Sequence, residues 1–330
     1  MPAVTPTLDD VKAAAARIAP YAFVTPLIEN AALNAHMGKR VLLKLETLQR
    51  TGTFKFRGAC NRILMIPEAE RGRGVVAFSS GNHAQAVAAV ATLFGMKATI
   101  VMPADAPRAK IAATRDFGAE VVLYDRTRQS REEIAAAIQA KTGATLVKPF
   151  DDPGVVAGQG TAGLEIAAQA RALGAEPDCA LAPASGGGLV SGIALALSGP
   201  LPGARVFSVE PENFASMKLS LEKGERINAQ AKPPSQADAL MSPFAGEVPF
   251  ALAKTYVAGG LGVTDAELDV AMSYAACRLK LVVEPGGSAA LAALLARKAP
   301  ADSKCTVVVL SGGNADFETV AAACARVPEP

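Results

Sequence analysis

The 330-residue sequence contains no tryptophan, two histidines and five cysteines, and no two cysteines are spaced as C-x-x-C. An odd number of scattered cysteines argues against a disulfide framework and against a zinc site. Residues 1–10 also lack the basic segment that opens a secretory or transit peptide. We therefore expect a cytoplasmic protein whose thiols are reduced.

Neither sign of charge dominates, and no hydrophobic run is suited to a membrane span. The 33 Lys and Arg residues balance 31 Asp and Glu residues, which gives a net charge of +2. Such a balance predicts binding neither to nucleic acid nor to an anionic membrane. The longest apolar stretch, residues 84–102, contains Gly95 and Lys97 and indicates a helix followed by a strand. A small-molecule partner is expected instead.

Half of the residues are hydrophobic, and apolar runs of strand length alternate with alanine-rich helical patterns. This alternation predicts an α/β fold with mostly parallel sheets flanked by helices, in which ligands bind at the carboxyl ends of strands. Three strand-to-helix units in residues 75–149 predict a small inserted domain, with residues 1–74 and 150–330 forming a larger one. The predicted strands are residues 40–46, 75–78, 98–102, 120–124, 180–184, 205–209 and 306–310.

Three consecutive glycines follow the predicted strand 180–184 and precede the predicted helix 189–197. Glycines without Cβ atoms let successive N–H groups converge on one point, and the helix adds the positive end of its dipole. Such a turn suits a phosphate, although a plain strand-to-helix connection has the same composition. The turn consists of Ser185, Gly186, Gly187, Gly188 and Leu189.

A second glycine-rich segment, with Gly158, Gly160 and Gly163, matches the dinucleotide-binding fingerprint. That fingerprint requires a buried strand directly before it. Residues 150–157 are too polar and too interrupted for such a strand. We therefore reject a dinucleotide site and expect the start of a helix at this segment.

Lys55 lies between Phe54 and Phe56, downstream of the predicted strand 40–46. One interpretation is an edge strand, with the phenylalanines facing inward and with Lys55 and Arg57 in water. The other is a lysine held between aromatic rings, where lost hydration lowers the pKa of the amine and makes it a nucleophile toward an aldehyde. The local pattern leaves both interpretations open.

Two hydroxyls, an amide and an imidazole gather at the turn between strand 75–78 and the helix that follows. A helix N-cap would explain Ser79, but it would not explain Ser80, Asn82 and His83. Free N–H groups at a helix start, together with two hydroxyls, suit the carboxylate of an amino acid, and the Asn82 amide suits a ring oxygen. A substrate-binding turn is the hypothesis here.

The last predicted strand ends in Ser311, Gly312, Gly313 and Asn314, which form either a plain connection or another ligand-binding turn. If a pyridine ring lies nearby, the Ser311 hydroxyl can hydrogen-bond its nitrogen without adding the negative charge that keeps a pyridinium protonated. A ring tuned in this way is a weaker electron sink and favours rapid elimination of a β-substituent.

Together these turns resemble those of the fold-type II pyridoxal-phosphate enzymes, and within them the serine/threonine dehydratase and serine racemase group. The resemblance implies the tryptophan-synthase-β-like fold and a homodimer. It implies that Lys55 forms an imine with pyridoxal 5'-phosphate, that Phe54 and Asn82 line the ring, and that Ser311 faces the ring nitrogen. The turn of residues 185–189 would bind the phosphate. The matching segments are 53–58, 79–83, 158–161, 185–189, 209–211, 283–285 and 311–314.

The same resemblance implies how the substrate is held. Ser80 stands where the family has a hydroxyl on the substrate face opposite the lysine, whereas Ser79, Asn82 and His83 would hold the substrate carboxylate. Arg131 resembles the residue that pairs with a second substrate carboxylate. The substrate would be an amino acid.

Many racemase-like members also bind a divalent cation through a Glu, a backbone carbonyl and an Asp. Glu210 and the carbonyl of Phe214 match two of these positions, which would suit Mg²⁺ or Ca²⁺. Ser216 occupies the Asp position, so that one anionic ligand is missing. Alternatively, Glu210 is a solvated residue at a strand end.

The activity implied by the resemblance is β-elimination of a hydroxy amino acid such as L-threonine or L-serine to a 2-oxo acid and ammonia. Racemisation of serine and dehydration of 3-hydroxyaspartate are the nearest alternatives. A protein that binds pyridoxal phosphate without catalysis is an alternative of another class.

Overall fold

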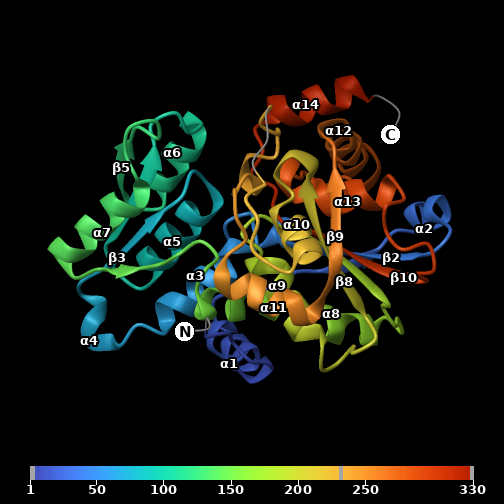
Figure 1. The fold of residues 1–330 in the computed structure, drawn as a ribbon, viewed down its shortest axis with the longest axis horizontal. Coiled ribbons are helices and arrows are strands. Elements are labelled where there is room, and N and C mark those ends of the chain that lie inside the picture. The colour runs from blue at the N-terminus through green and yellow to red at the C-terminus, as the bar shows by residue number, and fades with distance from the viewer. Residues whose placement is uncertain (1–3, 230–232, 328–330) are drawn as a thin grey trace.

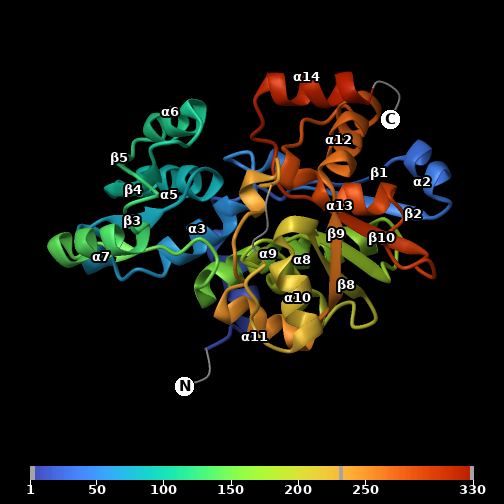
Figure 2. The same cartoon turned by 45° about the horizontal axis from the view of Figure 1, so that its top comes forward.

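The computed structural model describes residues 4–229 and 233–327 and contains two β-sheets (Figures 1 and 2). The larger sheet has the strand order β1-β2-β10-β7-β8-β9, and the smaller has the order β5-β4-β3-β6. Only the β1–β2 pair is antiparallel among the described pairs of named strands. The strands are β1 Leu27–Glu29, β2 Arg40–Leu45, β3 Val75–Phe78, β4 Ala98–Pro103, β5 Glu120–Tyr124, β6 Thr145–Leu146, β7 Cys179–Pro183, β8 Arg205–Pro211, β9 Val257–Val263 and β10 Cys305–Leu310.

Helices connect most of these strands, as the sequence predicted. Short 3-10 turns cover Glu46–Leu48, Glu212–Phe214 and Asp238–Leu240, and a π-helical turn covers Ala275–Leu279. The α-helices are α1 Leu8–Ile18, α2 Ala31–Met37, α3 Lys55–Leu64, α4 Glu68–Arg71, α5 Asn82–Leu93, α6 Arg108–Asp116, α7 Arg131–Thr142, α8 Pro153–Ala172, α9 Gly188–Leu197, α10 Ser216–Lys223, α11 Glu247–Tyr256, α12 Asp265–Tyr274, α13 Pro285–Leu295 and α14 Phe317–Arg326.

The six-stranded sheet is covered by helices on both faces. Successive residues of a strand point to opposite sides of the sheet, so that neighbouring residues pack against different helices. Leu43 and Val308 are paired in the β2–β10 register and share a buried cluster with residues of α12 and α13. Their chain neighbours Leu42 and Val307 belong to a second cluster with residues of α8 and α9. A sheet buried on both faces explains the continuous apolar runs in the sequence.

The four-stranded sheet has a core of its own. Its β3 and β4 residues pack with α5 on one face, while Phe78 and Val101 pack with Ala135 of α7 on the other. Residues of α3 share the first of these clusters, so that the packing extends beyond residues 75–149. The domain boundaries at residues 74 and 150 stay predictions.

The mostly parallel α/β architecture is confirmed, and the predicted strands 75–78 and 120–124 match β3 and β5. The expectation of a helix start at residues 158–163 is wrong, because this segment lies in the interior of α8. Its glycines allow close packing instead: a Cβ on Gly158 would lie 2.7 Å from the Arg57 carbonyl oxygen, and one on Gly160 would lie 2.8 Å from that of Gly192.

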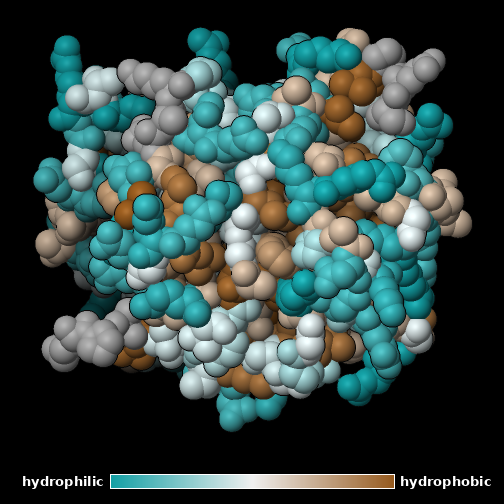
Figure 3. Space-filling view, turned by 45° about the vertical axis from the view of Figure 1, so that its right-hand side comes forward, coloured by the Kyte–Doolittle hydropathy of each residue, from teal (hydrophilic) through white to brown (hydrophobic). Residues whose placement is uncertain are grey.

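The face of the molecule drawn in Figure 3 is mostly hydrophilic, with smaller hydrophobic areas interspersed. Among the residues that the structure describes, no helix has both the length and the apolar character needed to cross a membrane.

Candidate active site

The turns after β3, β7 and β10 meet around one cavity of about 550 Å³. Each turn follows the carboxyl end of a parallel strand, where ligands of α/β proteins bind. The cavity brings together the predicted cofactor and substrate residues from both sheets. Those that line it are Phe54, Lys55, Ser79, Ser80, Asn82, His83, Arg131, Ser185, Gly186, Gly187, Gly188, Leu189 and Ser311.

Lys55 begins helix α3 and extends its amine into this cavity. Its Nζ donates a hydrogen bond to the carbonyl oxygen of Pro149 at 2.8 Å and lies 5.1 Å from the centre of the Phe54 ring. Burial lowers the pKa of the amine to about 8, against the opposing attraction of Glu284. A lysine with this pKa is neutral more often than an ordinary one, as reaction with an aldehyde requires.

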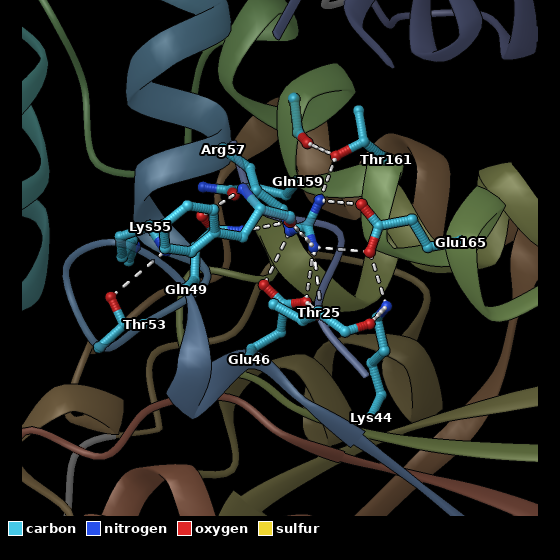
Figure 4. Close-up of polar contacts among 12 residues, drawn as sticks. Thr25, Lys44, Glu46, Gln49, Thr53, Lys55, Arg57, Gln159, Thr161 and Glu165 are labelled. Atoms are coloured by element: carbon cyan, nitrogen blue, oxygen red, sulfur yellow. Dashed lines mark hydrogen bonds and ion pairs between the residues drawn. The ribbon is translucent and has the colours of Figure 1, made fainter. Parts of the chain in front are cut away.

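The edge-strand interpretation of this segment is wrong, because Lys55–Leu64 is helical and Arg57 is fully buried. Figure 4 shows the Arg57 guanidinium between the carboxylates of Glu46 and Glu165. Its Nε lies 2.8 Å from Glu46 Oε2, and its Nη1 lies 2.6 Å from Glu165 Oε1. These pairs compensate the desolvation of the arginine and connect α3 to α8, the helix that carries Glu165.

The glycine turn has the geometry of an anion site. Gly187 has a φ of +90°, and α9 begins at Gly188, so that the first N–H groups of the helix have no intrahelical acceptor. A Cβ on Gly186 would lie 2.2 Å from the Phe150 ring, and the cradle therefore requires glycine. Lys55 and this turn fit the aldehyde and the phosphate of pyridoxal phosphate.

The start of α5 offers backbone donors and two hydroxyls. Ser79 does not cap the helix itself: its Oγ accepts a hydrogen bond from the Gly81 N–H at 3.2 Å, and Gly81 holds the cap position. His83 Nε2 donates to the Val147 carbonyl oxygen at 2.9 Å, and burial and the Lys55 charge lower its pKa to about 3. The neutral ring then keeps its proton on Nε2, so that His83 can offer a carboxylate its backbone N–H but no ring donor.

Ser311 directly follows β10, and Asn82 is the first residue of α5. The carbonyl oxygen of Ser311 accepts a hydrogen bond from the Phe54 N–H at 3.1 Å, which connects this turn to the lysine segment. Asn82 Nδ2 donates to Glu284 Oε1 at 2.5 Å. Sequence reasoning assigned no role to Glu284, although the motif 283–285 contained it. It also missed Phe150, Lys110 and Asp238, which line the same cavity.

Arg131 reaches the cavity from the first position of α7. Its guanidinium stacks on the Phe78 ring at 5.0 Å, and its Nε donates to Glu132 Oε1 at 2.8 Å. A recess of about 50 Å³ lies between Arg131, Arg126 and the serines Ser79 and Ser80. A cation therefore stands next to the turn predicted to bind the substrate.

The predicted cation ligands do not fit a divalent metal. Both oxygens of the buried Glu210 accept backbone hydrogen bonds, from the N–H groups of Met217 and Lys218, each at 2.8 Å. Glu210 is therefore not solvated, and its two hydrogen bonds hold the start of α10. Ser216 supplies no charge, and the described residues contain no group of three His, Cys, Asp or Glu side chains that could hold a metal.

Two sheet units, a lysine at the cavity between them and a glycine-rich anion turn constitute the architecture of fold-type II pyridoxal-phosphate enzymes. Residues 18–312 match the family described as "Pyridoxal-phosphate dependent enzyme". The chain belongs to this family.

Similar proteins cover nearly the whole chain. A serine racemase from Schizosaccharomyces pombe is 41% identical over 96% of this chain and 97% of its own length. An L-threo-3-hydroxyaspartate ammonia-lyase from Saccharomyces cerevisiae is 40% identical over 96% of both chains. The crystal structure of a T.th. threonine deaminase has a TM-score of 0.88 and 46% identity, and the match covers 94% of this chain and 99% of that one.

Proposed function

We propose that this protein is a pyridoxal-phosphate-dependent ammonia-lyase. It would perform β-elimination on a hydroxy amino acid such as L-threonine or L-serine and release a 2-oxo acid and ammonia. The observation that carries the proposal is the Lys55 amine, which shares one cavity with the glycine turn and with the uncharged Ser311. The similarity to a threonine deaminase and to a hydroxyaspartate ammonia-lyase supports the reaction class.

The proposed chemistry divides between cofactor and protein. When bound, pyridoxal phosphate supplies an aldehyde that captures amines and a ring that withdraws electrons. The turn of residues 185–189 would bind its phosphate, and Ser311 would hydrogen-bond its ring nitrogen. An uncharged hydroxyl at that nitrogen suits elimination.

Lys55 is the proposed general base for the α-proton of the substrate. With a pKa of about 8, its Nζ can accept a proton and return it near neutral pH, a role that typically contributes about 10²- to 10⁴-fold to a rate. The backbone N–H groups at the start of α5, together with the Ser79 hydroxyl, would hold the substrate carboxylate. Asn82 would hydrogen-bond the ring oxygen through its amide.

Serine racemisation is the alternative that uses the same groups. Ser80 lines the cavity and is the proposed proton carrier on the face opposite Lys55. A Ser80→Ala variant that loses racemisation and retains ammonia release would separate the two roles. Equal loss of both activities would contradict the separation.

A second candidate substrate is 3-hydroxyaspartate. The observation that favours it is the recess next to Ser79 and Ser80, where Arg131 can pair with a second carboxylate. The similarity to a yeast L-threo-3-hydroxyaspartate ammonia-lyase supports the same substrate class.

Ammonia release with L-serine, L-threonine and both 3-hydroxyaspartate diastereomers tests the proposed function. We expect release with at least one of them, and loss of release together with visible absorbance in Lys55→Ala. A holo-protein that keeps its Lys55-dependent absorbance but releases no ammonia from any of the four would favour the non-catalytic alternative. Absorbance that persists after Lys55→Ala would reject the lysine assignment.

We also infer a cytoplasmic location and a homodimer. The five cysteines are all free, as a reducing compartment favours. Leu48, Val282 and Phe317 are large apolar side chains exposed on the isolated chain, and a second copy would cover such residues. Sedimentation at several protein concentrations tests the dimer, and a monomer at every concentration would reject it.

A further inference from the structure

Glu284 is a buried carboxyl group that lines the cavity. It directly precedes α13 and is 3% exposed. Its backbone N–H donates to the Gly312 carbonyl oxygen at 3.1 Å, which holds it next to the turn that follows β10. Oε1 accepts from Asn82 Nδ2, and Oε2 is buried without a hydrogen-bond partner among the described residues. Burial of a polar atom without a hydrogen-bond partner costs free energy, and a role for Glu284 in the site would explain why this carboxyl group is there.

Asn82 is held at both ends of its amide. Asn314 Nδ2 donates to Asn82 Oδ1 at 3.0 Å and to the Thr51 carbonyl oxygen at 3.0 Å. The Thr51 carbonyl can only accept, and this fixes which end of Asn314 faces Asn82. At the other end Glu284 Oε1 accepts whether the carboxyl group is charged or carries a proton on Oε2. The chain of hydrogen bonds therefore directs Asn82 Nδ2, and not Oδ1, toward Glu284.

This arrangement decides what Asn82 can offer a ligand. An amide nitrogen carries two hydrogens, and Glu284 takes one of them. The second hydrogen remains for the cavity that Asn82 lines. Without the acceptor at Glu284, the amide would lose one of the two contacts that hold its plane.

We propose that Glu284 is a positioning residue that orients the Asn82 amide so that it donates a hydrogen bond to the ring oxygen of the cofactor. This inference rests on the proposed function. A donor at that oxygen favours its ionised form, and thereby lowers the pKa of the lysine-bound chromophore. Glu284 thus acts through Asn82 and does not itself touch the reacting atoms.

The charges around Glu284 offer a competing explanation. Lys55 of α3, Lys110 of α6 and Asp238 of the 3-10 turn Asp238–Leu240 all act on this carboxyl group. Burial raises the pKa of Glu284 to about 7, the Lys110 charge opposes this and Asp238 reinforces it. A direct effect of the Glu284 charge on the chromophore must therefore be separated from an effect through Asn82.

Two conservative variants make that separation. Glu284→Gln retains an oxygen acceptor at the same reach and removes the charge. Glu284→Asp retains the charge but is one methylene shorter, so that it loses the contact with Asn82. If Glu284 acts by positioning Asn82, the pKa of the chromophore in the Gln variant should equal that of the wild type, and the pKa in the Asp variant should differ.

The experiment is a pH titration of the visible absorbance of the purified holoenzyme. In Glu284→Asp we expect the pKa of the chromophore to rise by about one unit, a tenfold change, because a hydrogen bond to an ionised oxygen contributes about that much. Glu284→Gln should leave it unchanged. In an Asn82→Ala background, Glu284→Asp should cause no further shift, since coupled residues are non-additive.

Three results would overturn the inference. They are a shift in Glu284→Gln without one in Glu284→Asp, a shift that persists in the Asn82→Ala background, and no shift in either variant. A wild-type holoenzyme without Lys55-dependent visible absorbance would instead reject the proposed function. Thermal melting of each variant reports folding. If the Asp variant does not fold, Asn314→Ala removes the other hydrogen bond to the same amide, and the same upward shift is expected.

Discussion

The amine of Lys55 lies 2.8 Å from the carbonyl oxygen of Pro149, which belongs to the segment between the four-stranded sheet and α8. The lysine itself begins a helix that packs against both α5 and α8. One hydrogen bond thus joins the candidate nucleophile to the connection between the two sheet units. The position of the amine depends on how these units pack.

The lowered pKa of Lys55 predicts the pH dependence of cofactor uptake. Below pH 8 the amine is mostly protonated, and its reactive neutral fraction rises about tenfold per pH unit. The rate at which the apo-protein gains visible absorbance with pyridoxal phosphate should therefore rise up to about pH 8 and then level off. A rate that continues to rise toward pH 10 would indicate an ordinary lysine.

Gly186→Ala should weaken cofactor binding. The added Cβ would lie 2.2 Å from the Phe150 ring, and overpacking of this kind costs about 1–3 kcal/mol, or about 5- to 150-fold in affinity. Equilibrium titration with pyridoxal phosphate measures the change. Gly203→Ala is the matched control, because no atom lies within 4 Å of its added Cβ. Equal affinity in both variants would contradict the phosphate assignment.

Arg131→Ala should distinguish dicarboxylate from monocarboxylate substrates. If 3-hydroxyaspartate is a substrate, its kcat/KM should fall by about 10- to 150-fold, the value of a charge-assisted hydrogen bond of about 1.5–3 kcal/mol. The kcat/KM for L-serine or L-threonine should change little. Arg128→Ala is the control, since Arg128 is an exposed residue paired with Asp125 and does not line the cavity. Loss of activity with all substrates alike would oppose a role in specificity.

Removal of divalent cations should leave this protein unaffected. Both Glu210 oxygens already accept backbone hydrogen bonds, and Ser216 offers no negative charge in the position of the third ligand. Dialysis against EDTA should therefore change neither Tm nor ammonia release, and added Ca²⁺ or Mg²⁺ should change neither. A Tm that falls with EDTA and recovers with Ca²⁺ would show that a cation binds after all.

Arg57→Met should destabilise the fold strongly. Burial alone would raise the pKa of Glu46, but the Arg57 charge and hydrogen bonds hold it below the ordinary value. Removal of Arg57 leaves the buried Glu46 without its ion-pair partner, at a cost of about 3–5 kcal/mol. Chemical denaturation measures the loss. Lys97→Ala removes a pair with Glu120 in which both side chains are more than half exposed, and it should cost less than about 1 kcal/mol. An equal loss of unfolding free energy in the two variants would contradict the expectation that the buried pair contributes more than the exposed one.

Much of the fold could be predicted from the alternation of apolar, strand-length runs with helical patterns in the sequence. The strand β3 is a buried apolar run and β5 is a partly exposed one, and helical patterns flank both, so that their bounds could be predicted from local sequence. The segment 53–58 could not be predicted in this way. Its alternation of aromatic and basic residues matches an edge strand, and only the distant carboxylates of Glu46 and Glu165 make a buried Arg57 favourable.

The sequence by itself determined the chemistry available to this protein: a lysine between aromatic rings, a triple-glycine turn, and hydroxyl-bearing turns after apolar strands. Each of these features is local, because it can be read from a few consecutive residues and the apolar strand that precedes them. The tertiary structure decided what those groups meet. It set the Glu284–Asn82 contact, the Lys55–Pro149 hydrogen bond and the hydrogen bonds by which Glu210 holds the start of α10. Each of these contacts forms only when the elements that carry the two residues pack together.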